Sequence, residues 1–190
     1  MKNVDLEQVK KHLRNDHKFM SGVDRGDRAK DTDEFFTPTE LVQRGLDLFS
    51  PESWSPEKTF IDHSCGDGQI LSEVIIRKME NGSTYERALA TTYGIEFMED
   101  NCCLLIKRLY GVGVDKSIEV EVIKDKTNER VPKSYYWPDS LKAVFFYNGI
   151  FIKNIVCASS LEYDFSFGEN DTELFTVKET FGHGLFQQIY

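Results

Sequence analysis

The stretch Phe-Ile-Asp-His-Ser-Cys-Gly-Asp-Gly-Gln-Ile-Leu, residues 60–71, decides the fold because it joins three patterns in one order. An apolar run ends at Asp62, a tight turn with two glycines follows, and apolar residues then recur at helical spacing. We therefore predict a strand, a glycine turn and a helix, the opening unit of an α/β nucleotide-binding sheet. Gly66 and Gly68 let the backbone approach a ligand where a Cβ atom would collide, and the helix N-terminus offers free N–H groups. A generic α/β turn is the alternative.

Composition indicates one folded domain. The chain has 190 residues, of which 40% are hydrophobic and 13% aromatic, so it can bury a sizeable core. No apolar run approaches the ~20 residues that span a bilayer, and the first residues lack the apolar segment of a signal peptide. We therefore predict a cytoplasmic protein without membrane contact. The four cysteines form no C-x-x-C pair, so we predict free thiols and no metal site.

The net charge of −9 bears on possible partners. Contacts to phosphate usually require a basic surface. DNA therefore stays a candidate partner, but we do not expect this chain to bind DNA without another protein. A protein partner or a homo-oligomer is the alternative.

Residues 62–68 carry a resemblance to a known family. The order Asp-x-Ser-Cys-Gly-x-Gly resembles motif I of the S-adenosylmethionine-dependent amino-methyltransferases of DNA, whose usual form is Asp-Pro-x-Cys-Gly-x-Gly. His63 stands where that family usually has proline. The resemblance implies that S-adenosylmethionine is the cofactor. The residues that it implies as cofactor contacts are Asp62, Ser64, Cys65, Gly66, Asp67 and Gly68.

Upstream of the turn, Phe36, Thr37 and Pro38 match a second motif. The Phe-x-Thr-Pro segment resembles motif X of the same methyltransferases, which packs over the methionine end of the cofactor. Read from the residues alone, Thr37 is an N-cap and Pro38 the first position of a helix that runs to about Phe49.

A second predicted strand, residues 91–96, ends in an acid. A carboxylate at such a strand end can accept hydrogen bonds from both ribose hydroxyls of a nucleoside. Glu96 lies about 30 residues beyond the glycine turn and is followed by Phe97 and Met98, which resembles motif II of the family. The resemblance implies that Glu96 binds the ribose and that Phe97 or Met98 covers the adenine. An ordinary surface glutamate is the alternative.

Residues 154–161 are expected to form a core strand that runs into a loop, where the chain resembles motif III. In the family an acidic residue here hydrogen-bonds the adenine amino group. Ser159 occupies that position, with Ser160 beside it. A hydroxyl can accept the same hydrogen bond, although more weakly than a carboxylate.

Residues 111–153 follow a different pattern, which we interpret as an inserted β element. Residues 117–123 alternate apolar and polar, and two apolar runs flank Asn148-Gly149, a signal for a type I′ hairpin. The aromatic residues 135–137 either stack on bases or pack against their own sheet. We divide the chain into an N-terminal helix with a mobile loop, residues 1–34, and one methyltransferase-like domain, residues 35–190.

The resemblance as a whole implies a Rossmann-like class I methyltransferase fold, three-layered α/β/α, incomplete at its C-terminus and with an inserted β-hairpin. The implied activity is methyl transfer to adenine N6 in DNA. However, the Asn/Asp-Pro-Pro-Tyr/Phe motif that holds the target amino group is absent, because none of the five prolines are adjacent. We therefore leave the catalytic residues unassigned. Two alternatives stay open: a catalytically inactive binding or regulatory module (a pseudoenzyme), and a methyltransferase for small molecules or proteins.

Overall fold

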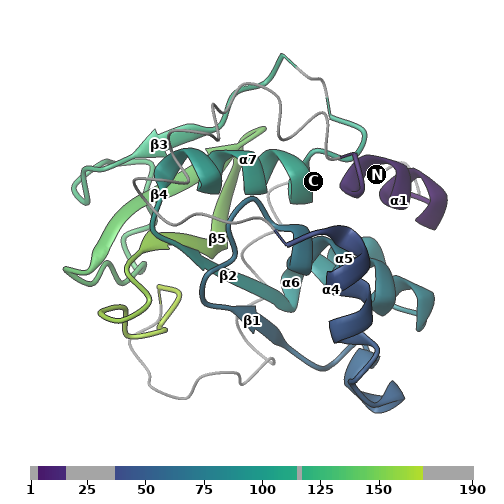
Figure 1. Ribbon diagram of the computed structural model, residues 1–190. Helices are drawn as coiled ribbons and strands as arrows, with labels where there is room; N and C mark the ends of the chain where they lie inside the picture. Colours follow the sequence, from purple (N-terminus) through teal and green to yellow (C-terminus); the bar gives the residue numbers. More distant parts are fainter. Residues whose placement is uncertain (1–3, 16–36, 115–116, 169–190) are drawn as a thin grey trace.

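A mixed sheet of five strands forms the centre of this computed structural model, which describes residues 4–15, 37–114 and 117–168 (Figure 1). The strands lie in the order β1-β2-β5-β4-β3. Their bounds are Phe60–Asp62 for β1, Thr92–Glu96 for β2, Glu121–Ile123 for β3, Leu141–Tyr147 for β4 and Ile150–Ala158 for β5. The helices are α1 Leu6–Leu13, α4 Thr39–Leu46, α5 Gln69–Glu80, α6 Tyr85–Ala90 and α7 Glu99–Tyr110, with a 3-10 turn at Pro51–Trp54. The α/β class is therefore confirmed.

The first half of the sheet is parallel and follows the predicted order of elements. β1 pairs with β2, and β2 pairs with β5, each in parallel. The glycine turn joins β1 to α5, as predicted for residues 60–71. Because parallel strands end at the same edge of a sheet, β1, β2 and β5 bring their carboxyl ends together.

The second half of the sheet is antiparallel and begins with the predicted hairpin. Asn148 has φ 50° and Gly149 has φ 77°, and two successive positive φ values are the signature of a type I′ turn. The expectation of a separate inserted element is wrong in one respect. The hairpin strand and the predicted core strand are one continuous nine-residue strand, β5, so β3 and β4 extend the parallel half instead of forming a unit apart.

The two faces of the sheet are covered differently. One face packs on α1, α5, α6 and α7 around a core that includes Val9, Ile75 and Leu105. The other face is covered by extended segments, with Val131 and Phe167 in its core. In the part of the chain that the structure describes, no helix lies on this second face, so the expected three-layer arrangement is not seen there.

The aromatic residues 135–137 pack on this second face. The Tyr135 and Phe151 rings meet edge to face, with centroids 5.0 Å apart. The Trp137 indole N–H donates to the carbonyl of Leu141 at 3.0 Å. These contacts support the interpretation that the aromatic residues pack on their own sheet.

Helix α4 begins one position later than the capping pattern predicts. Pro38 occupies the N-cap position, where it has no side-chain hydrogen bond to offer, and Thr37 lies outside the helix. Val42 and Leu46 pack against Val74 of α5 in a small cluster beside β1. Among the described residues, no helix combines the length and the apolar composition that crossing a bilayer requires.

Lys78 of α5 is a buried cation beneath β1. It is fully buried, its ammonium donates to the backbone carbonyl of Lys58, and it lies 5.7 Å from the centroid of the Phe60 ring. Burial lowers the pKa of Lys78 to about 8; the positive charge of Arg87 adds to this shift and the negative charge of Glu57 opposes it.

This pKa predicts how the free energy of unfolding depends on pH. Between about pH 8 and the ordinary lysine pKa of 10.5, the unfolded state binds more protons than the folded state, so stability rises with pH. Relative to Lys78→Met, the wild-type protein should gain about 2 kcal/mol between pH 7.5 and 9.5. Denaturant titrations at both pH values measure this difference. Lys126→Met, at an exposed lysine, is the control, and an equal gain in both comparisons would contradict the prediction.

Candidate functional site

Three predicted contact residues lie where the parallel strands end. Asp62 is the last residue of β1, Glu96 is the last residue of β2, and Ser159 directly follows β5. The register pairs Asp62 with Gly94 and Glu96 with Cys157, so the ends are staggered along one edge of the sheet. The carboxyl edge of parallel strands is where ligands of open α/β sheets bind. The fold therefore gathers these side chains at a suitable edge.

The Glu96 carboxylate faces the glycine turn and not the solvent. Glu96 is 8% exposed. Its Oε2 accepts the Gly66 N–H at 3.0 Å, and its Oε1 accepts the Met98 N–H at 2.8 Å and the Asn101 amide at 3.4 Å. A carboxylate offers about four acceptor sites. Among the described residues, these three bonds leave Glu96 one acceptor position, on Oε2, the oxygen that contacts the turn.

The turn itself is fixed by contacts of its backbone and by packing. Cys65 donates its N–H to the Ile95 carbonyl at 3.1 Å, and its buried thiol lies 3.2 Å from the same oxygen. Burial raises the pKa of the Cys65 thiol well above its ordinary value. Gly68 has φ 87°, and a Cβ atom there would overlap the Leu105 side chain of α7. Gly66 has φ 51°. Cys65 and Gly68 thus serve core packing, and Gly66 presents backbone to Glu96.

Asp67 lies between the two glycines, but it is only 2% exposed and its side chain faces the interior. Its Oδ2 accepts a hydrogen bond from Arg108 of α7 at 2.8 Å, within a buried ion pair. Arg108 lies in the last turn of α7, and its side chain is buried. The sequence contains one indication of this burial: Arg108 falls on the apolar stripe of α7 with Leu105 and Leu109.

Asp62 carries a carboxylate oxygen that has no hydrogen-bond partner. Its Oδ1 accepts the Ser64 N–H at 3.0 Å, whereas its Oδ2 is buried and unpaired among the described residues. Burial raises the pKa of Asp62, while the Ser64 N–H and the charge of His63 act in the opposite direction. A buried acceptor without a partner is costly, and a ligand with an N–H donor or a positive charge would satisfy it.

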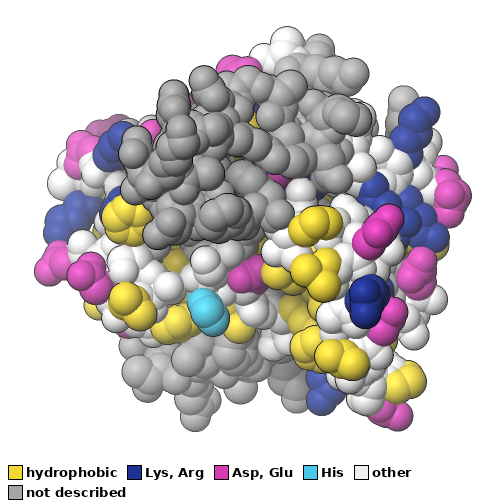
Figure 2. Space-filling view, viewed as in Figure 1, with side chains coloured by type: hydrophobic (Ala, Val, Ile, Leu, Met, Phe, Trp, Pro, Cys, Tyr) yellow, Lys and Arg dark blue, Asp and Glu magenta, His cyan; other side chains and the backbone are white. Residues whose placement is uncertain are grey.

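A cavity of about 430 Å³ adjoins Asp62. Thr37 and Asp62, which belong to two different predicted motifs, line the same cavity. Its remaining walls are mostly apolar and come from α4, β1 and the start of α5; they include Leu41, Leu46, Phe49, Ile61, Ile70 and Val74. Figure 2 shows hydrophobic side chains gathered over α4 on this side of the molecule, and Leu41 is 56% exposed there.

Apart from Thr37 and Asp62, the predicted contact residues either do not line this cavity or fall outside the described residues; Glu96 and the turn residues 65–68 lie beside it. The Phe97 ring is 55% exposed and is covered on one face by the Lys142 ammonium. Met98 precedes α7 and donates its N–H to Glu96. Ser159 and Ser160 are half-buried beyond β5. Phe36 falls among the residues that the structure does not describe.

Comparison with known proteins adds no identification, since no family model, curated protein or solved structure matches this chain. Within the described ranges, no group of three or more histidine, cysteine, aspartate or glutamate side chains could hold a metal ion. The features that define this site are therefore the strand ends, the turn and the cavity.

Gly94 of β2 supports the turn from below, which gives a testable prediction. A Cβ atom at Gly94 would lie 2.8 Å from the Cys65 sulfur, 3.0 Å from Leu71 and 3.1 Å from Ile155. Gly94→Ala should therefore lower the free energy of unfolding by about 1–3 kcal/mol through overpacking. Chemical denaturation measures this loss.

Gly45 provides the matched control, because a Cβ atom there meets nothing within 4 Å in α4. Gly45→Ala should leave stability unchanged or raise it by up to about 1 kcal/mol. Similar stabilities of the two variants would show that the space beneath Cys65 does not require glycine.

Proposed function

We propose that this protein binds S-adenosylmethionine at the carboxyl ends of β1 and β2, in the manner of the adenine-N6 amino-methyltransferases of DNA. One observation carries the proposal: the Gly66 N–H of the glycine turn and the Glu96 carboxylate, 30 residues apart in the chain, lie 3.0 Å apart. The sequence resemblance requires that these two elements form one pocket. Their contact supports a class I methyltransferase fold for this part of the chain.

In this proposal Glu96 binds the ribose. Glu96 has one acceptor position left after its bonds to Gly66, Met98 and Asn101. A ribose hydroxyl can take that position, and a second hydroxyl can replace the Gly66 N–H as donor to Oε2. The released Gly66 N–H then becomes a donor for the ligand. Hydrogen bonds to a buried carboxylate are charge-assisted and so are stronger than neutral ones.

Asp62 and Thr37 would receive the methionine end of the cofactor. The buried Oδ2 of Asp62 lacks a partner among the described residues, and an α-ammonium group would supply both a donor and a positive charge. The cavity beside Asp62 also contains Thr37, as expected if the segment that resembles motif X packs over the same part of the cofactor.

The reaction that we infer for an active enzyme is transfer of the methyl group from the sulfonium to adenine N6 in DNA. Most of the rate would come from holding the two reactants in line, since no covalent intermediate is needed. The alternative, a catalytically inactive module that binds the cofactor or a partner protein, has two observations in its favour. The chain lacks adjacent prolines, and its net charge is −9.

Calorimetric titration with S-adenosylmethionine tests the binding proposal. Glu96→Ala should weaken binding by about 1–3 kcal/mol through the lost charge-assisted bonds. Gly66→Val should abolish binding, because a branched side chain would fill the ligand space at a residue with φ 51°. Glu99→Ala removes a half-exposed carboxylate close by and is the control. Absence of binding by the wild-type chain would refute the proposal.

Asp62→Asn gives a separate prediction about the methionine end. The amide keeps the shape of Asp62 but loses the negative charge, so S-adenosylmethionine should bind about tenfold more weakly, which corresponds to one charge-assisted hydrogen bond. Asp139→Asn, at a fully exposed carboxylate, is the control. Equal affinities of the two variants would mean that Asp62 does not contact the ammonium group.

Methyl transfer is tested with a radiolabelled donor and DNA that contains unmethylated adenine. We expect label in the DNA if the chain is an active enzyme, and donor binding without transfer if it is an inactive module. Transfer that persists in Glu96→Ala at the wild-type rate would place the reaction at another site.

A further inference from the structure

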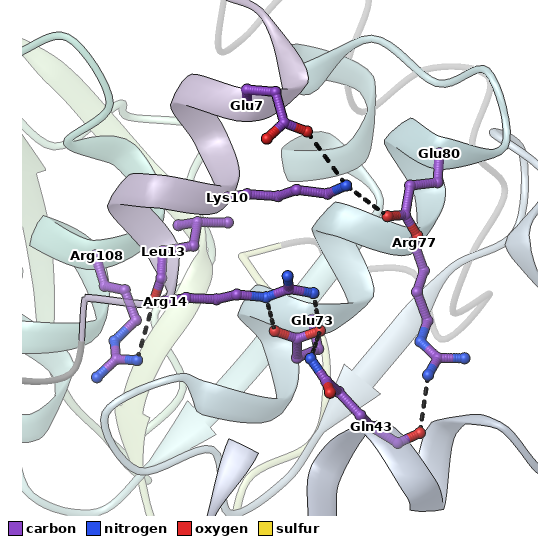
Figure 3. Close-up of polar contacts among 9 residues, drawn as sticks. All are labelled: Glu7, Lys10, Leu13, Arg14, Gln43, Glu73, Arg77, Glu80 and Arg108. Carbon is purple, nitrogen blue, oxygen red and sulfur yellow. Dashed lines mark hydrogen bonds and ion pairs between the residues drawn. The ribbon is translucent and has the colours of Figure 1, made fainter. Parts of the chain in front are cut away.

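The N-terminal helix α1 and the glycine turn both contact one buried arginine. Arg108 donates from Nη2 to Asp67 in the turn at 2.8 Å, and from Nη1 to the carbonyl of Leu13, the last residue of α1, at 3.3 Å. The Arg108 and Asp67 side chains are 1% and 3% exposed. Figure 3 shows the guanidinium of Arg108 reaching the end of α1.

The chemistry of both partners suits a guanidinium. The last carbonyl groups of a helix have no partner within the helix and carry its partial negative charge. A planar guanidinium offers several N–H donors in fixed directions, so it can bind a carboxylate and a carbonyl together. A lysine ammonium at the same position could not hold both partners at these distances with the same geometry.

The position of Asp67 connects this contact to the proposed site. Asp67 lies between Gly66, whose N–H meets Glu96, and Gly68, whose N–H donates to the Cys65 carbonyl at 2.9 Å. When the Asp67 side chain is bound to Arg108, the backbone between the two glycines is also held, and these glycines have little steric restriction of their own.

Helix α1 is itself held firmly, so it can serve as a fixed point. Leu13 is fully buried in the core. The neighbouring Arg14 makes two hydrogen bonds to Glu73 of α5, at 2.6 and 2.9 Å, and Glu73 also accepts from Gln43 of α4 at 3.2 Å (Figure 3). Glu73 is 2% exposed, so its carboxylate is shielded from water, whereas the Arg14 side chain is 38% exposed.

We infer that Arg108 is a positioning residue that uses the end of α1 to hold the glycine turn in its ligand-binding conformation. The inference rests on the proposed function, because the turn is the proposed contact for the cofactor. It adds a role for helix α1: the end of this helix supports the binding site without contacting the ligand.

The test compares Arg108→Lys with Arg130→Lys, the same chemical change at an arginine that pairs with Glu121 of β3. Two quantities are measured on each folded variant, the hydrogen exchange of the Gly66 and Gly68 amides by NMR and the dissociation constant for S-adenosylmethionine. For Arg108→Lys we expect both amides to exchange about tenfold faster and the ligand to bind about tenfold more weakly. For Arg130→Lys, whose partner Glu121 belongs to neither α1 nor the turn, both quantities should stay within twofold of wild type.

A second variant covers the case in which Arg108→Lys does not fold. The double replacement Asp67→Leu/Arg108→Met removes the buried pair and fills its space with apolar atoms, a change that proteins often tolerate. This variant should also show fast exchange at Gly66 and Gly68 together with weak binding. Unchanged exchange in either folded variant overturns the inference, and so does loss of folding in both, because the pair would then serve the fold alone.

The exchange measurement needs no ligand, so the two proposals can fail separately. If the wild-type chain does not bind S-adenosylmethionine, the proposed function fails, whereas faster amide exchange in Arg108→Lys would still show that Arg108 holds the turn. If the wild type binds and Arg108→Lys binds equally well, the positioning role fails alone.

Discussion

The hydrogen bond between the Gly66 N–H and Glu96 is the contact on which the proposed site depends. β1 is only three residues long, so its pairing with β2 fixes little of the chain that follows. The turn is instead tied down residue by residue: Cys65 to the Ile95 carbonyl, Gly66 to Glu96 and Asp67 to Arg108. The end of β1 is therefore positioned by β2 and α7. Glu96, the acid at the end of β2, also helps to hold the turn in its conformation.

Glu96 thus has two roles that compete. In the described structure its carboxylate satisfies N–H groups of the turn and of the start of α7. A nucleoside hydroxyl that displaces the Gly66 N–H from the Glu96 carboxylate removes one hydrogen bond that holds the turn. The ligand must then offer the Gly66 N–H an acceptor of similar strength. Arg108 and Cys65 hold the turn independently of Glu96, which would allow the carboxylate to exchange partners while the turn keeps its place.

Local pattern was sufficient to predict the strand, turn and helix around residues 60–71 and the hairpin at Asn148-Gly149, since each depends on neighbouring residues. The buried Arg108 pair could not be predicted, because Asp67 lies 41 residues away in the chain. The sequence pattern predicts a boundary between an inserted element and a core strand at residue 154, but the structure has one continuous strand there. Asn154 is polar, but it is buried and forms hydrogen bonds with Leu89 and Tyr110. Strand β5 therefore continues through a residue at which the sequence pattern predicts a boundary.

The position of β1 at the margin of the sheet determines what bounds the cavity. In doubly wound sheets the ligand crevice opens where consecutive strands lie on opposite sides of one strand. Among the described residues, all other strands lie on the β2 side of β1. The cavity at Asp62 is therefore enclosed by one strand and two helices, α4 and α5, and not by two strands. Thr37 and α4 consequently form the wall that a neighbouring strand would otherwise provide, so the segment that precedes the glycine turn shapes the pocket as directly as the turn does.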